Sequence, residues 1–390
     1  MKKLLLVALS ILMAATVFAA GGQEERTDGK IKAGFIYVGP TADFGWSYAH
    51  EEVRKMLEEK YDWFDSVYIE SVPEGDAGRY IDRLINEEKC DIIFTTSFGY
   101  MDATVKAAEM YPDVTFMHCS GYKQAPNLGT YFSELYQMYY LNGLMAGAMT
   151  ETDKVGYVAA FPTPELVRHI DAYALGVKAT NPDAKVDVRW TYAWYGPEKA
   201  REAAQALVAA GSDVLAFTED TPAVVEVGQE LMEEGKNVYT FSHYTPMQSY
   251  GEDTLLSGQI SNWFALYDKI LTDYKNGTWS NEDLWWLAKE DAARLGASEN
   301  VDELVNPKYV ETLKAKMVET PDLGTISVYD LVVKRYAQMK EGRESFDPYV
   351  GPLYDNEGNL QLSEGTMATK DQLLSMMYYV DNVLGSVPSE

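Results

Sequence analysis

Short apolar runs alternate with amphipathic stretches along the first third of the chain. Runs suited to strands begin near Ile31, Ser66, Cys90 and Val114. Between them, apolar residues recur at helical spacing over residues 47–60, 76–88 and 101–110. Continuous apolar runs are typical of strands that are buried on both faces. The pattern therefore predicts a parallel sheet with helices on both sides.

The second third repeats this scheme. Its apolar runs cover residues 155–160, 186–191, 214–218 and 238–242. Three predicted helix starts follow such strands and carry a proline, at Thr163-Pro164, Gly196-Pro197 and Thr221-Pro222. Proline suits the first helical turn, where its missing N–H would have no partner. The strand-then-helix rhythm predicts a second parallel sheet with right-handed crossovers.

These patterns predict an α/β fold of two doubly wound, Rossmann-like lobes with a ligand cleft between them. The first lobe is expected to comprise residues 31–133 plus about 263–283, and the second lobe residues 134–258. A strand over 255–262 leads into a helix over 263–274. Residues 284–390 are interpreted as a C-terminal segment that packs on the lobes. In this segment we expect helices over 301–317, 326–340 and 371–384, the last capped by Gly385, and a hairpin turn at 356–359.

The N-terminus has the pattern of a cleaved signal peptide. Lys2 and Lys3 precede an apolar stretch over 4–17, which is too short for a typical membrane span. Residues 17–19 fit the small-residue rule for cleavage after Ala19, and residues 20–30 form a polar, flexible leader. No cysteine lies near this site, so a lipid anchor is not expected. The alternative is an uncleaved membrane anchor. The leader predicts a mature protein in the periplasm or another extracytoplasmic space.

Composition excludes several classes of partner and site. The 33 basic and 60 acidic residues give a formal charge of −27, which disfavours nucleic acid and anionic lipid. Two cysteines and four histidines exclude a disulfide framework and make a structural zinc site improbable. Cys90 opens one predicted strand and Cys119 closes the next. These are opposite ends of parallel neighbours, so a disulfide between them is not expected.

Catalytic motifs are absent from the sequence. It contains no G-x-S-x-G, Walker A, G-x-G-x-x-G or H-E-x-x-H pattern. His50 is expected on a helix face against its lobe, His118 in the core and His169 facing solvent. His243 follows a strand, where contact with ligand and burial in the lobe are both open.

Aromatic and acidic residues gather after the predicted strands. Ligands of open α/β sheets bind beyond the carboxyl ends of the strands, so these residues are the candidates for a ligand site. The candidates are Asp43, Phe44, Trp46, Phe98, Tyr100, Asp102, Trp194, Tyr195, Asp220, His243, Tyr244, Asn262 and Trp263. Rings of this kind would stack on a flat heteroaromatic ligand, and carboxylates would accept its N–H groups. Alternatively, about half of these rings pack between the lobes.

Four ordered motifs resemble one known family. Residues 139–147 (YYLNGLMAG) and 153–158 (DKVGYV) are similar to the Y-L-A-G-x-x-A-G and G-K-V-G signatures of the BMP family of basic membrane lipoproteins and their soluble relatives. Residues 171–177 (DAYALGV) with Asn181-Pro182 resemble its D-x-F-x-x-G and N-P element, and 351–358 (GPLYDNEG) resemble a tail of one branch. The resemblance covers about residues 31–385. It implies a class I periplasmic binding-protein fold that closes on purine nucleosides or related bases.

The resemblance also implies roles for single residues. Trp46, with Phe44 beside it, falls on the ring that stacks on the base, Asp102 on the acidic residue of the third loop, and Trp194 or Tyr195 on a second ring. The family's ribose-binding Asp and Lys are replaced here by the stretch 242–244 (SHY) and by Ser261. Their loss favours a ligand without ribose, such as a free purine base. The strong negative charge also departs from the family's name.

The resulting hypothesis is a monomeric solute-binding protein that delivers a purine base or similar small heteroaromatic, nucleobase or nucleoside, to an ABC permease in the membrane. No catalytic residue, cofactor or metal is expected. The alternatives are an exported ligand-sensing receptor and, as a different class, an exported hydrolase of bases or nucleosides.

Overall fold

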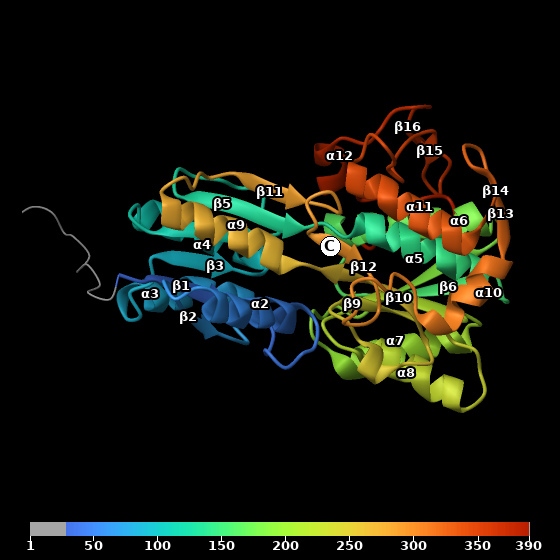
Figure 1. Ribbon diagram of the computed structural model, residues 1–390, viewed down its shortest axis with the longest axis horizontal. Coiled ribbons are helices and arrows are strands. Elements are labelled where there is room, and N and C mark those ends of the chain that lie inside the picture. Colours follow the sequence, from blue (N-terminus) through green and yellow to red (C-terminus); the bar gives the residue numbers. More distant parts are fainter. Residues whose placement is uncertain (1–28, 390) are drawn as a thin grey trace, which may run out of the picture.

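Residues 29–389 are described by the computed structural model. The predicted signal peptide and nearly all of the leader lie outside the described residues. Two α/β lobes lie next to one another along the long axis of the molecule (Figure 1). Each lobe is built around its own sheet, as the alternating pattern predicted.

A six-stranded, all-parallel sheet forms the centre of the first lobe. Its strand order is β11-β5-β4-β3-β1-β2. The strands are β1 (Ile31–Ile36), β2 (Phe64–Ile69), β3 (Ile92–Thr95), β4 (Thr115–Cys119), β5 (Leu128–Ser133) and β11 (Asp283–Trp286). Cys90 and Cys119 are both buried, and no disulfide joins them. That agrees with their expected places at opposite strand ends.

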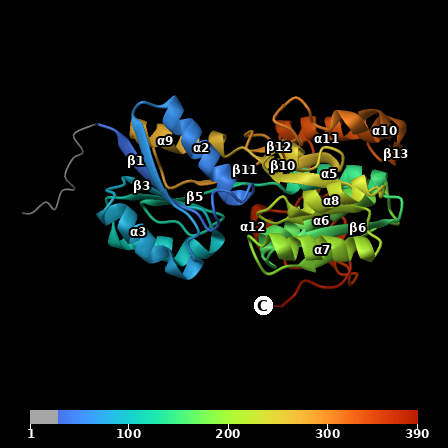
Figure 2. The same ribbon diagram turned by 90° about the horizontal axis from the view of Figure 1, so that it is seen from below.

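Four helices cover the two faces of this sheet. They are α2 (Trp46–Lys60), α3 (Ala77–Asn86), α4 (Met101–Met110) and α9 (Trp263–Asn276). α2 packs with α9, and α3 packs with α4 on the opposite face (Figure 2). A short 3-10 turn precedes each of α3 and α4, η1 (Glu74–Asp76) and η2 (Phe98–Tyr100).

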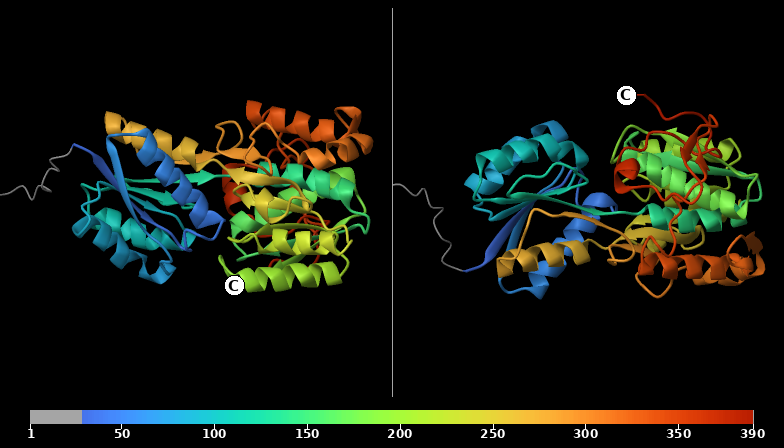
Figure 3. Two further views of the ribbon diagram at one scale, coloured as in Figure 1. Left: turned by 60° about the horizontal axis from the view of Figure 1, so that its bottom comes forward. Right: turned by 90° about the horizontal axis from the view of Figure 1, so that it is seen from above.

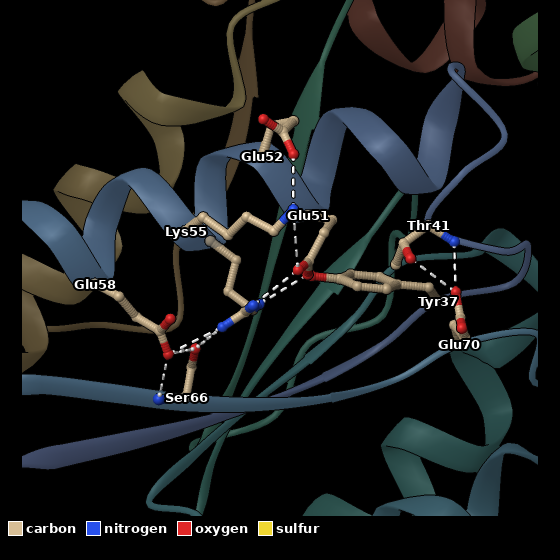
Figure 4. A network of polar contacts seen from close by, with 9 residues as sticks. Tyr37, Thr41, Glu51, Glu52, Lys55, Glu58, Ser66 and Glu70 are labelled. Carbon is tan, nitrogen blue, oxygen red and sulfur yellow. Dashed lines mark hydrogen bonds and ion pairs between the residues drawn. The ribbon is translucent and has the colours of Figure 1, made fainter.

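A polar network fastens α2 to the edge of the sheet. Arg54 on α2 pairs with Glu51 and Glu58 of the same helix and donates to the Ser66 hydroxyl of β2 at 2.7 Å. Glu51 in turn accepts from the Tyr37 hydroxyl beyond β1, 3.2 Å away (Figure 4). These contacts fix the helix whose first residue is Trp46.

The second lobe also contains six neighbouring strands. β7, β6 and β8 are parallel, β9 and β10 are parallel, and β12 is antiparallel to β10. The bridge between Val214 and Tyr239 joins the two groups. The strands are β6 (Lys154–Ala159), β7 (Lys185–Trp190), β8 (Val214–Thr218), β9 (Thr240–Tyr244), β10 (Leu255–Ser261) and β12 (Ala293–Leu295). The helices are α5 (Tyr136–Met149), α6 (Pro164–Thr180), α7 (Pro197–Ala209), α8 (Ala223–Glu233) and the turn η3 (Gln248–Tyr250).

The proline-marked helix starts lie where the sequence predicted them. α6 begins at Pro164, and the Thr163 side chain accepts a hydrogen bond from the Leu166 amide. α7 begins at Pro197, and α8 begins directly after Pro222. In each case the proline occupies a position whose amide needs no helical acceptor.

The chain crosses between the lobes three times. β5 runs into α5, β10 into α9, and β11 into β12. The crossings are bonded to one another, because the Ser133 hydroxyl and the Asn262 amide both donate to the Ala292 carbonyl, at 2.7 Å each. Together they form the covalent connection between the two lobes.

The C-terminal segment packs on the second lobe (Figure 3). α11 (Val328–Glu341) contacts α5, and α12 (Lys370–Leu374) contacts α6. The other elements are η4 (Pro307–Tyr309), α10 (Val310–Ala315), and the hairpins β13 (Met317–Thr320) with β14 (Gly324–Ser327) and β15 (Leu353–Tyr354) with β16 (Leu360–Leu362). The second hairpin turns at the predicted residues 356–359.

Two helix predictions in this segment were wrong. The range 301–317 contains only η4, α10 and the first residue of β13. The range 371–384 contains only α12 residues as regular structure, so Gly385 caps no helix. Apolar residues in both ranges face the second lobe at irregular spacing, and Val383 forms a bridge to Val186 at the edge of β7. Contacts with the lobe therefore replace helical hydrogen bonds. The pattern also missed β5, β11 and β12. β11 and β12 are only four and three residues long, whereas β5 has six residues and runs into α5.

Candidate functional site

The candidate site is a cleft between the lobes at the carboxyl ends of their strands. It consists of two adjoining cavities. The outer cavity has a volume of about 560 Å³ and the inner cavity one of about 20 Å³. Both are lined by Phe98, Ser120, Glu165 and Trp194, so these four side chains lie between the two cavities. Strand ends of both sheets meet here, as the rule for open α/β sheets requires.

Aromatic rings form the walls of the inner cavity. Trp46 begins α2 and donates its indole N–H to the Thr96 carbonyl at 2.5 Å. Its ring meets Tyr244, the last residue of β9, edge to face at 5.0 Å between centroids. Trp194 follows β7 and packs against Phe161 at 5.0 Å. Rings from both lobes thus contact one another across the cleft, through Trp46 and Tyr244.

Two carboxyl groups from the second lobe also line the inner cavity. Glu165 lies in the first turn of α6, and Asp220 follows β8. Burial, together with the nearby Glu134 charge, raises the pKa of Glu165 to about 7, against the lowering effect of Arg168. Burial and the charges of Asp43, Glu219 and Glu165 raise the pKa of Asp220 well above its ordinary value. Glu219 precedes Asp220 in the chain and is not part of the lining of the inner cavity. Burial raises the pKa of Glu219 to about 8.

A buried ion pair between Glu134 and Arg168 lies at the outer cavity, and Arg168 is part of the cavity lining. Glu134, on the crossing from β5 to α5, accepts from Arg168 at 2.7 Å, His169 at 2.9 Å and the Trp285 indole at 3.0 Å. Burial alone would raise the pKa of Glu134, but Arg168 and His169 hold it well below its ordinary value. His169 was expected to face solvent, and this was wrong. It is fully buried because Glu134 supplies a partner that the sequence pattern does not reveal.

The outer cavity also has walls from remote parts of the chain. Asp283 and Trp285 come from β11, and Lys370, Asp371, Leu374 and Ser375 come from α12 and the residue after it. Lys370 pairs with Asp283 and lies over the Trp285 ring, 5.4 Å from its centroid. A side chain attached to the second lobe thereby contacts the edge strand of the first lobe across the mouth of the cavity.

A sequence profile of the Bmp family, described as "ABC transporter substrate-binding protein PnrA-like", matches residues 30–326. The chain belongs to the Bmp family. A purine-binding protein of Brucella abortus (strain 2308) is 33% identical over 381 residues, 97% of this chain and 100% of that protein. A putative ABC transporter glucose-binding protein of Haloferax volcanii is 38% identical over 271 residues, 68% of each chain. The solved structure of an ABC transporter solute-binding protein from Aeropyrum pernix K1 shares the fold, with a TM-score of 0.63 at 16% identity over 80% of this chain and 86% of that one.

Membership of the Bmp family makes this chain a substrate-binding protein of the ABC-importer type. Such proteins act outside the cytoplasm, where they bind a small molecule and meet a membrane permease. In residues 29–389, none of the helices combines the length and the hydropathy that a bilayer span needs.

The Bmp motifs near residue 140 and residue 175 serve the packing of the second lobe rather than the cleft. A Cβ added at Gly143 would lie 2.1 Å from the Tyr173 carbonyl oxygen, and one at Gly176 would lie 2.1 Å from that of Tyr140. The close approach of α5 to α6 at this point therefore requires glycine at both positions. The motif carboxylate Asp171 is buried and accepts from the Val380 amide at 3.1 Å, which ties the C-terminal segment to α6.

The structure brings five of the candidate residues together as cavity lining. They are Trp46, Phe98, Trp194, Asp220 and Tyr244. Whether these side chains contact the ligand stays a prediction.

Two buried candidates in the first lobe, Asp43 and Tyr100, have other contacts. The Asp43 carboxylate accepts from the amides of Gly45, Ser47 and Tyr48 at 2.8–3.0 Å and so caps α2. Burial raises its pKa to about 6 despite these bonds. Tyr100 is buried and donates to the Val72 carbonyl at 2.6 Å.

Asp102 and Phe44 lie at the surface, outside the cavity lining. Asp102 is exposed on α4 and pairs with Lys123 at 2.6 Å. α4 begins only after the turn η2, which places Phe98 at the cleft and turns Asp102 away from it. Phe44 is half exposed and packs on Tyr48 and on Tyr250 of the second lobe.

The remaining candidates lie behind or beside the cavity. His243 is buried between the Tyr139 hydroxyl and the Gln259 amide, both 3.1 Å from Nδ1, and burial holds its pKa well below the ordinary value. Trp263 is fully buried and stacks on His50 at 4.3 Å. Asn262 donates to the Asp291 carbonyl at 2.8 Å, within the crossings. Tyr195 is exposed.

Several lining residues were missed from the sequence. Glu165 could have been found, because it follows the marked Thr163-Pro164 helix start after a strand. Ser120 and Tyr122 follow β4 and could have been found by the same rule. Phe132, Arg168, Trp285 and Lys370 carry no local signal, since only tertiary packing brings them to the cleft.

Proposed function

We propose that this Bmp-family protein binds a purine base or a similarly small heteroaromatic solute and delivers it to an ABC permease. The observation that carries the proposal is the cleft, where an outer cavity of about 560 Å³ adjoins a small inner cavity that Trp46, Trp194 and Tyr244 line beside two carboxyl groups. Stacked rings favour a flat π-system, and buried carboxylates favour its N–H edges. The purine-binding relative from Brucella abortus supports the same ligand class.

A free base fits this cleft better than a nucleoside. The ribose-binding Asp of related sequences is replaced by residues whose side chains serve the second lobe itself. Ser242 Oγ accepts from the Met247 amide at 3.0 Å, and His243 is held between Tyr139 and Gln259. Ser261 stands where the Lys would be, and it offers a small hydroxyl instead of a charge. Tyr244 reaches Trp46 and fills space that a sugar would need.

The proposal includes export and a purely binding role. The pattern of residues 1–19 supports a cleaved signal peptide without a lipid anchor, and the cleft supports reversible binding by lobe closure without bond chemistry. The intact mass of exported protein tests the first point: a retained leader or a lipid adduct would contradict it. Incubation with adenine and adenosine, followed by chromatography, tests the second, and conversion of either compound would favour a hydrolase.

Ligand identity is tested on the purified full chain. Mass spectrometry of material released by denaturation should show a purine or a related base. Calorimetric titration should give tighter binding of adenine than of adenosine. Glucose is the informative comparison because of the relative from Haloferax volcanii. Tighter binding of glucose, or no binding of any purine, would overturn the proposal. Tighter binding of adenosine would show that outer-cavity residues hold the ribose.

A further inference from the structure

The two cavities of the cleft differ in what they can hold. The inner cavity, of about 20 Å³, has room for no more than a water-sized group, and the rings of Trp46 and Tyr244 are already in edge-to-face contact beside it. The outer cavity, of about 560 Å³, has the size of a small-molecule pocket. A bicyclic base fits only in the outer of the two, so the side chains that line the outer cavity decide how such a base is held.

Arg168 is a buried cation in the lining of the outer cavity. It lies on α6 and is only 3% exposed. Its Nε and Nη2 atoms contact the same carboxylate oxygen of Glu134, at 2.9 and 2.7 Å. A guanidinium carries N–H donors on all three of its nitrogens, so these contacts leave the donors of Nη1 for another acceptor. A buried N–H without a partner is costly, and an acceptor atom in the cavity would therefore be stabilised here.

Glu134 fixes the position of this guanidinium. Besides Arg168, it accepts from His169 at 2.9 Å and from the Trp285 indole at 3.0 Å, and it is fully buried. The guanidinium carbon also lies 5.8 Å from the ring centre of Phe132, another residue of the lining. Arg168 is thus held in one orientation before a ligand arrives, so little side-chain entropy is lost on binding.

The start of α6 also favours an acceptor. Thr163, Pro164 and Glu165 line the outer cavity, so the amino end of this helix faces the space and brings positive partial charge to it. Burial raises the pKa of Glu165 to about 7, so its carboxyl group can accept or donate near neutral pH. Arg168, in contrast, only donates, and it keeps its charge throughout this range.

Other groups in the lining can donate to a ligand as well. Lys370 is already paired with Asp283, and the Trp285 indole N–H with Glu134. Besides Glu165, the remaining side-chain donors of the lining are neutral: the hydroxyl groups of Ser120, Tyr122, Thr163 and Ser375 and the indole N–H of Trp194. A hydrogen bond from a charged donor is about twice as strong as one from a neutral donor. A bond from Arg168 should therefore dominate the affinity for an acceptor atom.

We propose that Arg168 contacts the ligand, and that its Nη1 donates a hydrogen bond to an acceptor atom on the edge of the bound base. This rests on the proposed function and deepens it, because it names a ligand-contacting side chain and the kind of atom that it recognises. The acceptor is a ring nitrogen or an exocyclic oxygen, so this bond does not by itself separate amino-substituted from oxo-substituted purines.

Ligands that lack a single acceptor test this bond on the full chain. Adenine, or hypoxanthine if it binds more tightly, is titrated calorimetrically beside analogues in which one ring nitrogen is replaced by C–H. For hypoxanthine the series includes purine, which lacks the O6 oxygen. At least one analogue should bind about tenfold or more weakly than the complete base, because it leaves Nη1 without its acceptor.

A variant assigns this loss to Arg168. Removing the guanidinium alone would leave Glu134 as an unpaired buried charge, so the variant is the double substitution Glu134→Gln, Arg168→Met. In this variant the affinities of the base and of the weakened analogue should differ by less than about threefold. Arg189→Met is the matched control, because Arg189 is exposed on β7, pairs with Asp187 at 2.8 Å and lines neither cavity. It should keep the ratio of the parent protein.

Melting temperatures confirm that each variant is folded. If the double variant does not fold, Arg168→Lys takes its place, since it keeps a charge for Glu134 but has no Nη1.

The outcomes separate the two levels of the argument. Equal affinities across the series in the parent protein, or a ratio that the Arg168 variant leaves unchanged, overturn the inference and leave the proposed function standing. A ratio that disappears in that variant but persists in Arg189→Met supports the inference. Failure of every purine to bind overturns the proposed function, and the inference with it.

Discussion

The aromatic side chains of the cleft differ in how much they pack within the protein and how much they face the cavities. Trp46 is 6% exposed and packs on His50, Tyr244 and Trp263, so its removal would cost about 3–5 kcal/mol of stability as well as a ligand contact. Trp194 is only partly buried and lines both cavities. Trp194 is therefore the cleaner probe of ligand stacking.

We expect Trp194→Ala to weaken purine binding by about tenfold or more, because a lost stacking pair and its buried area cost at least about 1.4 kcal/mol. Calorimetry with adenine measures the change. Tyr195→Ala removes the neighbouring exposed ring, which lines neither cavity, and should leave affinity unchanged. Equal effects of the two substitutions would contradict the placement of Trp194.

Gly45 permits the lobes to touch. A Cβ at this position would lie 2.6 Å from Asp220 Cα, a backbone atom that cannot rotate away. Gly45→Ala should therefore increase the separation of the lobes. We expect a larger radius of gyration in small-angle scattering and a lower ligand affinity. Gly78→Ala is the control, since a Cβ there meets nothing within 4 Å. A Gly45→Ala protein as compact as the parent would show that this contact does not limit closure.

At the scale of elements, α12 forms a noncovalent link between the two lobes. It packs on α6 of the second lobe, and its first residue, Lys370, pairs with Asp283 on the edge strand of the first lobe. The family match ends at residue 326, so this wall of the outer cavity lies beyond the matched region.

We expect Lys370→Ala to speed ligand release by about two- to fivefold, the scale of a partly exposed ion pair of up to about 1 kcal/mol. Stopped-flow dissociation of adenine measures it. Lys178→Ala breaks a similar pair, Lys178 with Asp381 at 2.5 Å, which joins the C-terminal segment to α6 without spanning the cleft. Equal release rates in the two variants would show that the pair across the mouth does not retain ligand.

At the scale of the whole molecule, closure brings acidic groups together in a protein that is already strongly acidic. Burial raises the pKa of Glu165 to about 7 and that of Asp220 well above its ordinary value, with Asp43 and Glu219 contributing at Asp220. Arg168 acts in the opposite direction on Glu165. Separation of the lobes exposes these groups to water, where carboxyl pKa values return to about 4.

A carboxyl group whose pKa is raised in the closed form binds its proton more tightly there. The closed form is then fully favoured below about pH 4, and this advantage is lost as the pH rises through about 7. We expect the empty protein to become less compact in small-angle scattering over that range. The double variant Glu165→Gln, Asp220→Asn should show a flatter response. Greater compactness at high pH would contradict the assignment.

The hydrophobic pattern alone predicted the parallel strands β1–β4 and β6–β10, most of the helix bounds it proposed and the proline-marked starts of α6 and α7. These features depend on local periodicity and on backbone chemistry, which one segment carries by itself. The motif glycines were recognised from sequence as well, although their role in the contact between α5 and α6 became clear only from the packed helices.

Tertiary structure decided which side chains meet in the cleft. Strand-end position found Trp46, Phe98, Trp194, Asp220 and Tyr244, yet it also selected Asp102, which α4 carries to the surface. His169 is buried because it pairs with Glu134, which is distant in sequence. α12 is short because the residues after it pack on the second lobe instead of continuing the helix. A local pattern records which face of an element is apolar, but it does not record which remote residue will satisfy a buried charge or cover an edge. That pairing is fixed only when the lobes pack.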